Sequence, residues 1–162
     1  MSWRSAFVRQ ARSEQEVRKL LNSAAIEYSH RLHYLQMVSE KIAKAFQVGP
    51  DDPKPPEFVH RGFVRLLQTL KSRSDIQRAL GFNNKRAYEQ YIASLLDLAD
   101  RVERLAPSLA GVNQPNPEYP WMDVATQTVI APVDYSFSLF DRGNTRMIKL
   151  EALLDKLLYV IA

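Results

Sequence analysis

Apolar side chains recur at steps of three, four and seven residues along most of the chain, which is the spacing of one buried helical stripe. The clearest stripe predicts a long helix over residues 24–47. Gly49 and Pro50 are expected to end this helix, because glycine suits a left-handed cap and proline cannot continue a helix. The members of the stripe are Leu21, Ala25, Tyr28, Leu32, Leu35, Ile42 and Phe46.

A shorter apolar pattern precedes this helix. Ser13 and Glu16 have the spacing of a capping box, in which each side chain bonds to the backbone amide of the other at the first turn of a helix. We therefore expect a short helix that begins at Ser13, with Val17, Leu20 and Leu21 as its apolar face. The basic residues nearby are expected to lie on a solvated helix face; they are Arg4, Arg9, Arg12, Arg18 and Lys19.

Three further helices are predicted in the middle of the chain, after a proline-rich loop at residues 49–57. Apolar residues at helical spacing place them at residues 56–71, 74–80 and 84–106. We expect Gly81 to end the second of these helices. Asn83 or Asn84 is expected to cap the third, and Pro107 to end it.

No helical period survives over residues 107–144, where proline occurs at 107, 115, 117, 120 and 132. The pattern predicts a long loop with one short extended piece within residues 128–137. Large apolar side chains on this loop would be unfavourable in water, so we expect it to wrap the bundle or to cover a partner surface. These side chains are Tyr119, Trp121, Val129, Ile130, Tyr135, Phe137 and Phe140.

The last helix is predicted to begin near Thr145 and is apolar around much of its circumference. Such a helix is expected to be central or to lie at an interface between two copies of the chain. Its apolar residues are Met147, Leu150, Leu153, Leu154, Leu157, Leu158, Val160 and Ile161. Convincing alternating strands are lacking, so the sequence predicts one all-α domain over residues 1–162, an up-and-down bundle of four to five helices.

Composition narrows the class of protein only a little. The 162 residues include no cysteine, which excludes disulfides, thiolate metal sites and cysteine nucleophiles. The start of the chain lacks the uninterrupted apolar run of a secretory signal, and no segment is apolar for long enough to cross a bilayer. We therefore expect a cytoplasmic protein with no membrane partner. The net charge of +4 permits contact with nucleic acid but does not argue for it.

The predicted helix over residues 24–47 has a second, semi-polar face. On a wheel of about 100° per residue, that face lies nearly opposite the apolar stripe. It carries His30, His33, Met37, Lys41 and Lys44, with Tyr34 and Glu40 at its margins. Two histidines three residues apart can meet one metal ion, and a histidine can act as a general base. The more ordinary interpretation is a set of polar residues that are solvated or hydrogen-bonded at a helix interface.

Sequence motifs for common chemistries are absent. The chain has no HExxH, no GxSxG and no glycine-rich phosphate loop, and it contains only five glycines. We therefore expect no metal, no cofactor and no standard catalytic site.

The segment HYLQMVSEKIAKAF resembles the second helix of the HEPN superfamily, which are small helical bundles. That helix reads aromatic, then Ala-Glu-Lys-x-x-Lys-Ala, and Ser39 here stands in place of the alanine. The matching residues are Tyr34, Glu40, Lys41, Lys44 and Ala45. The segment VHRGFVRLLQTL, with His60, is similar to the third helix of the family, and PNPEYPW to its tyrosine-proline segment. The resemblance covers about two thirds of the chain and suggests an uncharacterised bacterial branch of the superfamily.

Many HEPN proteins are metal-independent ribonucleases, in which four to six residues separate an arginine from a histidine that follows it. For His30, His33 and His60 that arginine would stand at 23–25, 26–28 or 53–55, and none of these positions holds one. Other members of the superfamily are accessory subunits that pair with a nucleotidyltransferase or bind nucleotide or RNA. The resemblance therefore implies binding without catalysis.

Two functions follow as expectations. The first is a non-catalytic homodimeric module that binds nucleotide, RNA or a protein such as a nucleotidyltransferase. The alternative is a metal-independent ribonuclease in which His33 or His60 works with a neighbouring arginine. The candidate binding residues are His30, Arg31, His33, Glu40, Lys41, Lys44 and His60.

Overall fold

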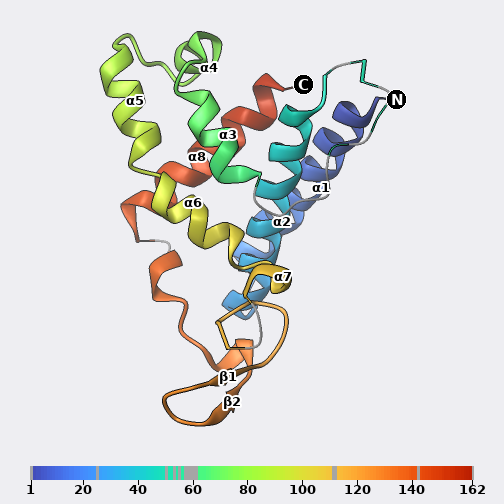
Figure 1. Cartoon of the computed structure of the whole chain (residues 1–162), viewed down its shortest axis with the longest axis vertical. Helices are drawn as coiled ribbons and strands as arrows, with labels where there is room; N and C mark the ends of the chain where they lie inside the picture. Colours follow the sequence, from blue (N-terminus) through green and yellow to red (C-terminus); the bar gives the residue numbers. More distant parts are fainter. Residues whose placement is uncertain are drawn as a thin grey trace.

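The computed structural model describes residues 2–24, 26–49, 51–52, 54, 56, 62–110, 113–141 and 143–161. It is mostly helical, as the sequence predicts, with one small two-stranded sheet. The helices gather at one end of the molecule, and the strand hairpin projects from the other end (Figure 1). The elements are α1 (Trp3–Ser23), α2 (Tyr28–Gln47), α3 (Phe63–Leu70), α4 (Ser74–Ala79), α5 (Lys85–Ala93), α6 (Leu96–Glu103), α7 (Pro107–Ala110), β1 (Trp121–Asp123), β2 (Thr128–Ile130), the 3₁₀ turns η1 (Pro132–Asp134) and η2 (Ser138–Phe140), and α8 (Thr145–Val160).

The N-terminal helix is longer than the sequence predicts. Its cap is Ser2, whose side-chain oxygen accepts a hydrogen bond from the backbone N–H of Ser5 at 3.3 Å. The predicted capping box at Ser13 is wrong, because Ser13 lies in the middle of α1. The predicted start of the next helix at residue 24 is also wrong. Ala24 is extended (φ −93°, ψ 154°), and α2 begins at Tyr28.

The core forms where the apolar stripes predict it. Leu32, Leu35 and Ile42 of α2 are almost completely buried, and they belong to one cluster with residues of α3, α6 and α8. Helix α8 is central, as its apolar pattern predicts. Its buried side chains are Met147, Leu150, Leu153, Leu154, Leu157 and Leu158.

The predicted helix over residues 84–106 is in fact two helices. Asn84 caps α5, because its side chain accepts a hydrogen bond from the amide of Ala87 at 3.0 Å. The break falls at Ser94 and Leu95, where the Ser94 hydroxyl donates to the carbonyl of Tyr91 at 2.7 Å. Side-chain bonds of this kind compete with the helical ladder and bend it. The bend leaves Leu95 fully buried between α5 and α6.

The segment before α8 is more regular than predicted. It contains α7, a hairpin of two strands and two 3₁₀ turns, whereas the sequence predicted one extended piece. Strand β2 lies in the predicted stretch, and β1 was not predicted. The aromatic rings of Trp121, Phe137 and Phe140 are buried, as their apolar character requires.

Three tyrosines, of which Tyr88 is buried and Tyr28 and Tyr91 are partly buried, donate their hydroxyl protons to backbone carbonyls. Burial raises the pKa of each to about 12. The acceptors for Tyr28, Tyr88 and Tyr91 are the carbonyl oxygens of Phe140, Leu70 and Lys149, respectively.

We expect a late phase in a spectrophotometric titration of the phenol groups. The folded-state pKa values exceed the ordinary value of 10.0. The neutral phenols therefore stabilise the fold fully below pH 10, and this stabilisation is lost as the pH rises toward 12. The 295 nm absorbance of the folded protein should include a step near pH 12 that shrinks in Tyr88→Phe. An unchanged late step in that variant would contradict the assignment.

None of the described helices is both long enough and apolar enough to cross a membrane.

Candidate functional site

The part of the second face of α2 that carries Lys41 and Lys44 lies against α1, so these lysines lie in a contact between two helices. The Lys41 ammonium lies 2.9 Å from a carboxylate oxygen of Glu14 on α1. Lys44 lies 2.5 Å from Glu40, one turn earlier on α2, and only 7% of Lys44 is exposed. Of the two arrangements expected for this face, solvated or hydrogen-bonded at a helix interface, Lys44 has the second. Gln36 donates to the other oxygen of Glu40 at 2.8 Å.

Charge is balanced inside this contact. Glu14 and Glu40 each accept from one lysine, so the two ammonium groups are paired with two carboxylates. The side chain of Glu14 is 4% exposed and that of Lys41 is 18% exposed. A phosphate that binds these lysines would have to displace carboxylates that the fold already holds in place. This geometry assigns Glu40, Lys41 and Lys44 to the packing of α1 on α2.

The other predicted site residues of α2 lie nearer to solvent. His30 is exposed. Arg31 donates to the carbonyl of Ile26 at 3.2 Å, and its guanidinium lies 4.7 Å from the ring centre of Tyr28. These contacts hold Arg31 against the first turn of its own helix.

His33 contacts the segment before α8. Its Nδ1 lies 2.9 Å from a carboxylate oxygen of Glu118, and about 30% of each side chain is exposed. His33 thus helps to fasten residues 115–121 to α2. The remaining histidine of the predicted site, His60, lies outside the described residues. Among the residues that are described, no three His, Asp or Glu side chains form a group that could hold a metal ion.

The basic residues of α1 are also more engaged than predicted. Arg18 is 5% exposed and bonds to Glu151 of α8 at 2.5 Å. Arg12 donates to the carbonyl of Leu158 at 2.9 Å. The predicted solvated face is therefore in part the contact of α1 with α8.

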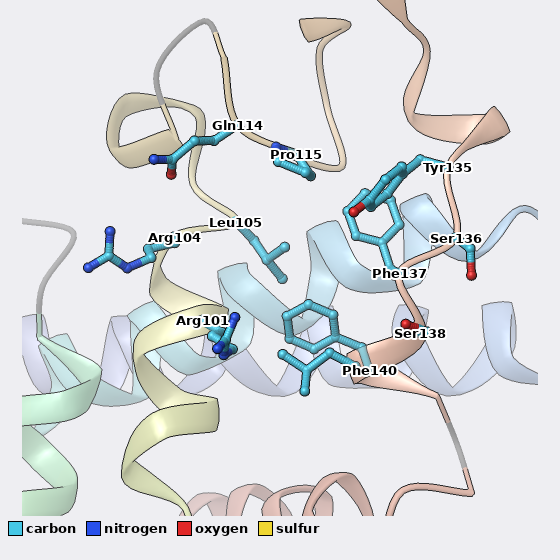
Figure 2. Close-up of a pocket in the computed structure, with 11 residues that line it drawn as sticks. Arg101, Arg104, Leu105, Gln114, Pro115, Tyr135, Ser136, Phe137, Ser138 and Phe140 are labelled. Atoms are coloured by element: carbon cyan, nitrogen blue, oxygen red, sulfur yellow. The ribbon is translucent and has the colours of Figure 1, made fainter. Parts of the chain in front are cut away.

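A cavity of about 240 Å³ lies elsewhere, between the C-terminal end of α6 and the chain that follows the hairpin. Figure 2 shows the two sides: Arg101, Arg104 and Leu105 on one, and Tyr135, Phe137 and Phe140 on the other. The described residues that line the cavity are Arg101, Arg104, Leu105, Gln114, Pro115, Tyr135, Ser136, Phe137, Ser138, Leu139 and Phe140.

The aromatic side of the cavity is held by ring contacts. Tyr135 and Phe137 meet edge to face with centres 4.9 Å apart, and Trp121 meets Tyr135 in the same way at 5.1 Å. Edge-to-face pairs are favoured by the ring quadrupole. Phe137 and Phe140 are 5% exposed, whereas Tyr135 is 38% exposed. The Tyr135 hydroxyl points across the cavity, toward the side of Pro115 and Leu105 (Figure 2).

The opposite rim is cationic. Arg104 donates to Asp100 at 2.7 Å, and Arg101 lies 3.5 Å from Asp97, one helical turn earlier in each case. More than half of each arginine side chain is exposed. Exposed pairs of this kind are worth roughly 0–1 kcal/mol. The two guanidinium groups can therefore exchange a carboxylate for a ligand phosphate with little loss of stability.

Sequence reasoning did not find this cavity. The two arginines lie on the predicted helix over residues 84–106, and the aromatic residues lie on the predicted loop, but neither pattern indicates that the two meet. The one available signal was the concentration of aromatic residues between prolines, which predicted a covered surface without saying which one.

Comparison of the chain with protein-family models, with curated proteins and with solved structures returns no match in any of the three.

Proposed function

We propose that the protein is a non-catalytic, HEPN-like binding module and that its ligand is a nucleotide held in the cavity between α6 and residues 135–140. The supporting observation is that one cavity joins an aromatic wall to two exposed arginines. A nucleotide has the matching parts, since its base is flat and apolar on both faces and its phosphates are anionic.

The dimensions favour one ring system in the cavity. Pockets for drug-sized ligands measure roughly 300–1,000 Å³. The cavity of about 240 Å³ is somewhat smaller, so the base would enter and the phosphates would remain at the rim. Stacking of a base on an aromatic side chain is worth about 1–3 kcal/mol. Arginine adds bidentate hydrogen bonds to phosphate oxygens.

The charge around the cavity favours a mononucleotide over RNA. Residues 105–141 include no lysine, arginine or histidine, and they include the acids Glu118, Asp123, Asp134 and Asp141. An RNA strand that leaves the cavity on this side would meet carboxylates, which have the same sign of charge as its phosphates. Strand-binding grooves are lined with basic residues instead.

Among the residues that the structure describes, no histidine lines the cavity. The ribonuclease alternative is supported by one observation, the pairing of His33 with Glu118, because a carboxylate can orient an imidazole as a general base. Cleavage of mixed RNA without divalent ions that is lost in His33→Ala would favour that alternative.

Binding can be measured by titration calorimetry with AMP, ADP and ATP. We expect Arg101→Ala and Arg104→Ala each to weaken binding by about tenfold or more, since a charge-assisted hydrogen bond contributes about 1.5–3 kcal/mol. Tyr135→Ala should weaken the binding of all three nucleotides equally, because it removes the stacking of the base on the tyrosine ring and leaves the contacts to phosphate in place. Arg86→Ala is the matched control, because Arg86 is an exposed arginine of α5 that does not line the cavity. Equal affinities for the wild type and both rim variants would overturn the proposal.

A further inference from the structure

Arg146, in the first turn of α8, lies beside the cationic rim of the cavity, although it is not among the described residues that line it. Its Nη1 atom is 3.6 Å from Oδ2 of Asp97 on α6. The same oxygen lies 3.5 Å from Nε of Arg101, which does line the cavity. Two guanidinium groups from two different helices therefore approach one point, and their separation cannot exceed the sum of these two distances.

The arginines follow one another along α6 and across to α8. Arg101 and Arg104 are three residues apart, so their side chains are neighbours on one face of α6. Asp97, which Arg146 approaches, lies one turn before Arg101, so Arg146 is on the other side of Arg101 from Arg104. Figure 2 shows Arg104, Arg101 and the ribbon of α8 in this order. The rim of the cavity thus continues as a row of three cations.

Carboxylates already occupy anion positions along this row. Asp97 lies against both Arg101 and Arg146, and Asp100 accepts from Arg104 at 2.7 Å. About half or more of each of these five side chains is exposed. Exposed pairs contribute little to stability, so the carboxylates can turn into solvent when a stronger anion arrives. Arginine binds phosphate and carboxylate with the same bidentate geometry, so the position of the Asp97 carboxylate is one that a phosphate can take.

The number of cations indicates the length of the phosphate chain. A single phosphate ester carries a charge of about −1.5 to −2 at neutral pH, which two arginines match. Arg101 and Arg104 are sufficient for it. Arg146 is a third cation, placed where a longer phosphate chain would extend from the first two.

We propose that the ligand is a nucleoside triphosphate and that Arg146 determines this specificity by binding the terminal phosphate in place of Asp97. The inference rests on the proposed function, which puts the base in the cavity and the first phosphate at Arg101 and Arg104. Asp97 is then an internal competitor, which pairs with both guanidinium groups until the phosphate chain displaces it.

Titration calorimetry with AMP and ATP tests the role of Arg146. The wild type should bind ATP at least tenfold more tightly than AMP, because a hydrogen bond to a charged group contributes about that factor. Arg146→Ala should bring the two affinities to within about twofold and leave the affinity for AMP unchanged. Lys149→Ala is the matched control, because Lys149 is an exposed cation one turn later on α8, and it should keep the preference for ATP.

Replacing Asp97 by asparagine tests the competition. The substitution keeps the size of the side chain and removes the charge that holds the two guanidinium groups, so ATP should bind about two- to fivefold more tightly. Weaker binding of ATP by Asp97→Asn would show that the carboxylate positions the arginines, and it would overturn the role assigned to Asp97.

Inorganic tripolyphosphate separates this inference from the proposed function, because it has no base. It should bind at least tenfold more tightly than inorganic phosphate, and Arg146→Ala should remove this advantage whereas Tyr135→Ala should not. If AMP and ATP bind the wild type equally, or if Arg146→Ala keeps the preference for ATP, the inference is overturned and nucleotide binding stands. If tripolyphosphate binds but none of the nucleotides binds more tightly than it, the proposed place of the base is overturned instead.

Discussion

Replacing Lys41 by methionine is expected to lower the free energy of unfolding by about 3 kcal/mol, because it leaves a buried carboxylate without its partner. The carboxylate is that of Glu14, whose side chain is 4% exposed. Among the described residues, the hydrogen bond that it would keep is the one from Gln10 at 3.0 Å. Urea denaturation followed by circular dichroism would measure the loss.

The double variant Glu14→Gln, Lys41→Met should recover most of this loss, since a neutral pair carries no uncompensated charge. Lys19→Met is the comparison, because Lys19 pairs with Glu16 at 3.2 Å in an exposed position and should change stability by less than about 1 kcal/mol. If Lys41→Met and Lys19→Met had equal effects, the pairing of α1 with α2 would not contribute as the geometry indicates.

Replacing Glu103 by alanine is the second large effect that we expect. Glu103 is 5% exposed, and its carboxylate accepts from the backbone amides of Phe63 at 2.5 Å and Val64 at 3.0 Å. It therefore caps the first turn of α3 from α6. Hydrogen bonds to a charged group contribute about 1.5–3 kcal/mol, and the substitution leaves both buried amides unsatisfied. We expect Glu103→Ala to destabilise the fold by about 3 kcal/mol in the same denaturation experiment.

Glu103→Gln retains an acceptor oxygen and should lose less than half as much. Asp100→Ala is the control, since Asp100 is about half exposed and its pair with Arg104 lies in solvent. Equal losses for the alanine and glutamine variants would contradict this account, because glutamine keeps both the side-chain volume and an acceptor oxygen.

The helices and the core were predictable because the buried side chains of a helix recur at regular intervals in the sequence. The stripe of Leu32, Leu35 and Ile42 identifies the inner face of α2 without any knowledge of its neighbours. Capping motifs, which involve only a few neighbouring residues, predicted the ends of helices less well. Ser13 and Glu16 have the spacing of a helix start, but the same spacing also occurs inside α1, where Ser2 had already supplied the cap.

The candidate site was harder to predict, because it depends on contacts between segments far apart in the sequence. A helical wheel shows that Lys41 and Lys44 lie away from the main stripe, but it does not show that α1 covers them. In the same way, Arg101 and Tyr135 come from segments whose relative position no local pattern determines. The segment that leads to Tyr135 has no helical period in its sequence. Its position therefore depends on the contacts that the Trp121 ring makes with other aromatic rings.

The buried side of α1 is mostly hydrophilic. Its buried residues are Val8, Ala11, Glu14, Gln15 and Arg18. Glu14 pairs with a residue of α2, and Gln15 and Arg18 each bond to a residue of α8. Two small apolar side chains would tolerate several axial positions, whereas a shift by one turn would break all three polar contacts together. We infer that these contacts give the N-terminal helix a single position along its neighbours, so that α1 cannot slide even where its apolar packing would allow it.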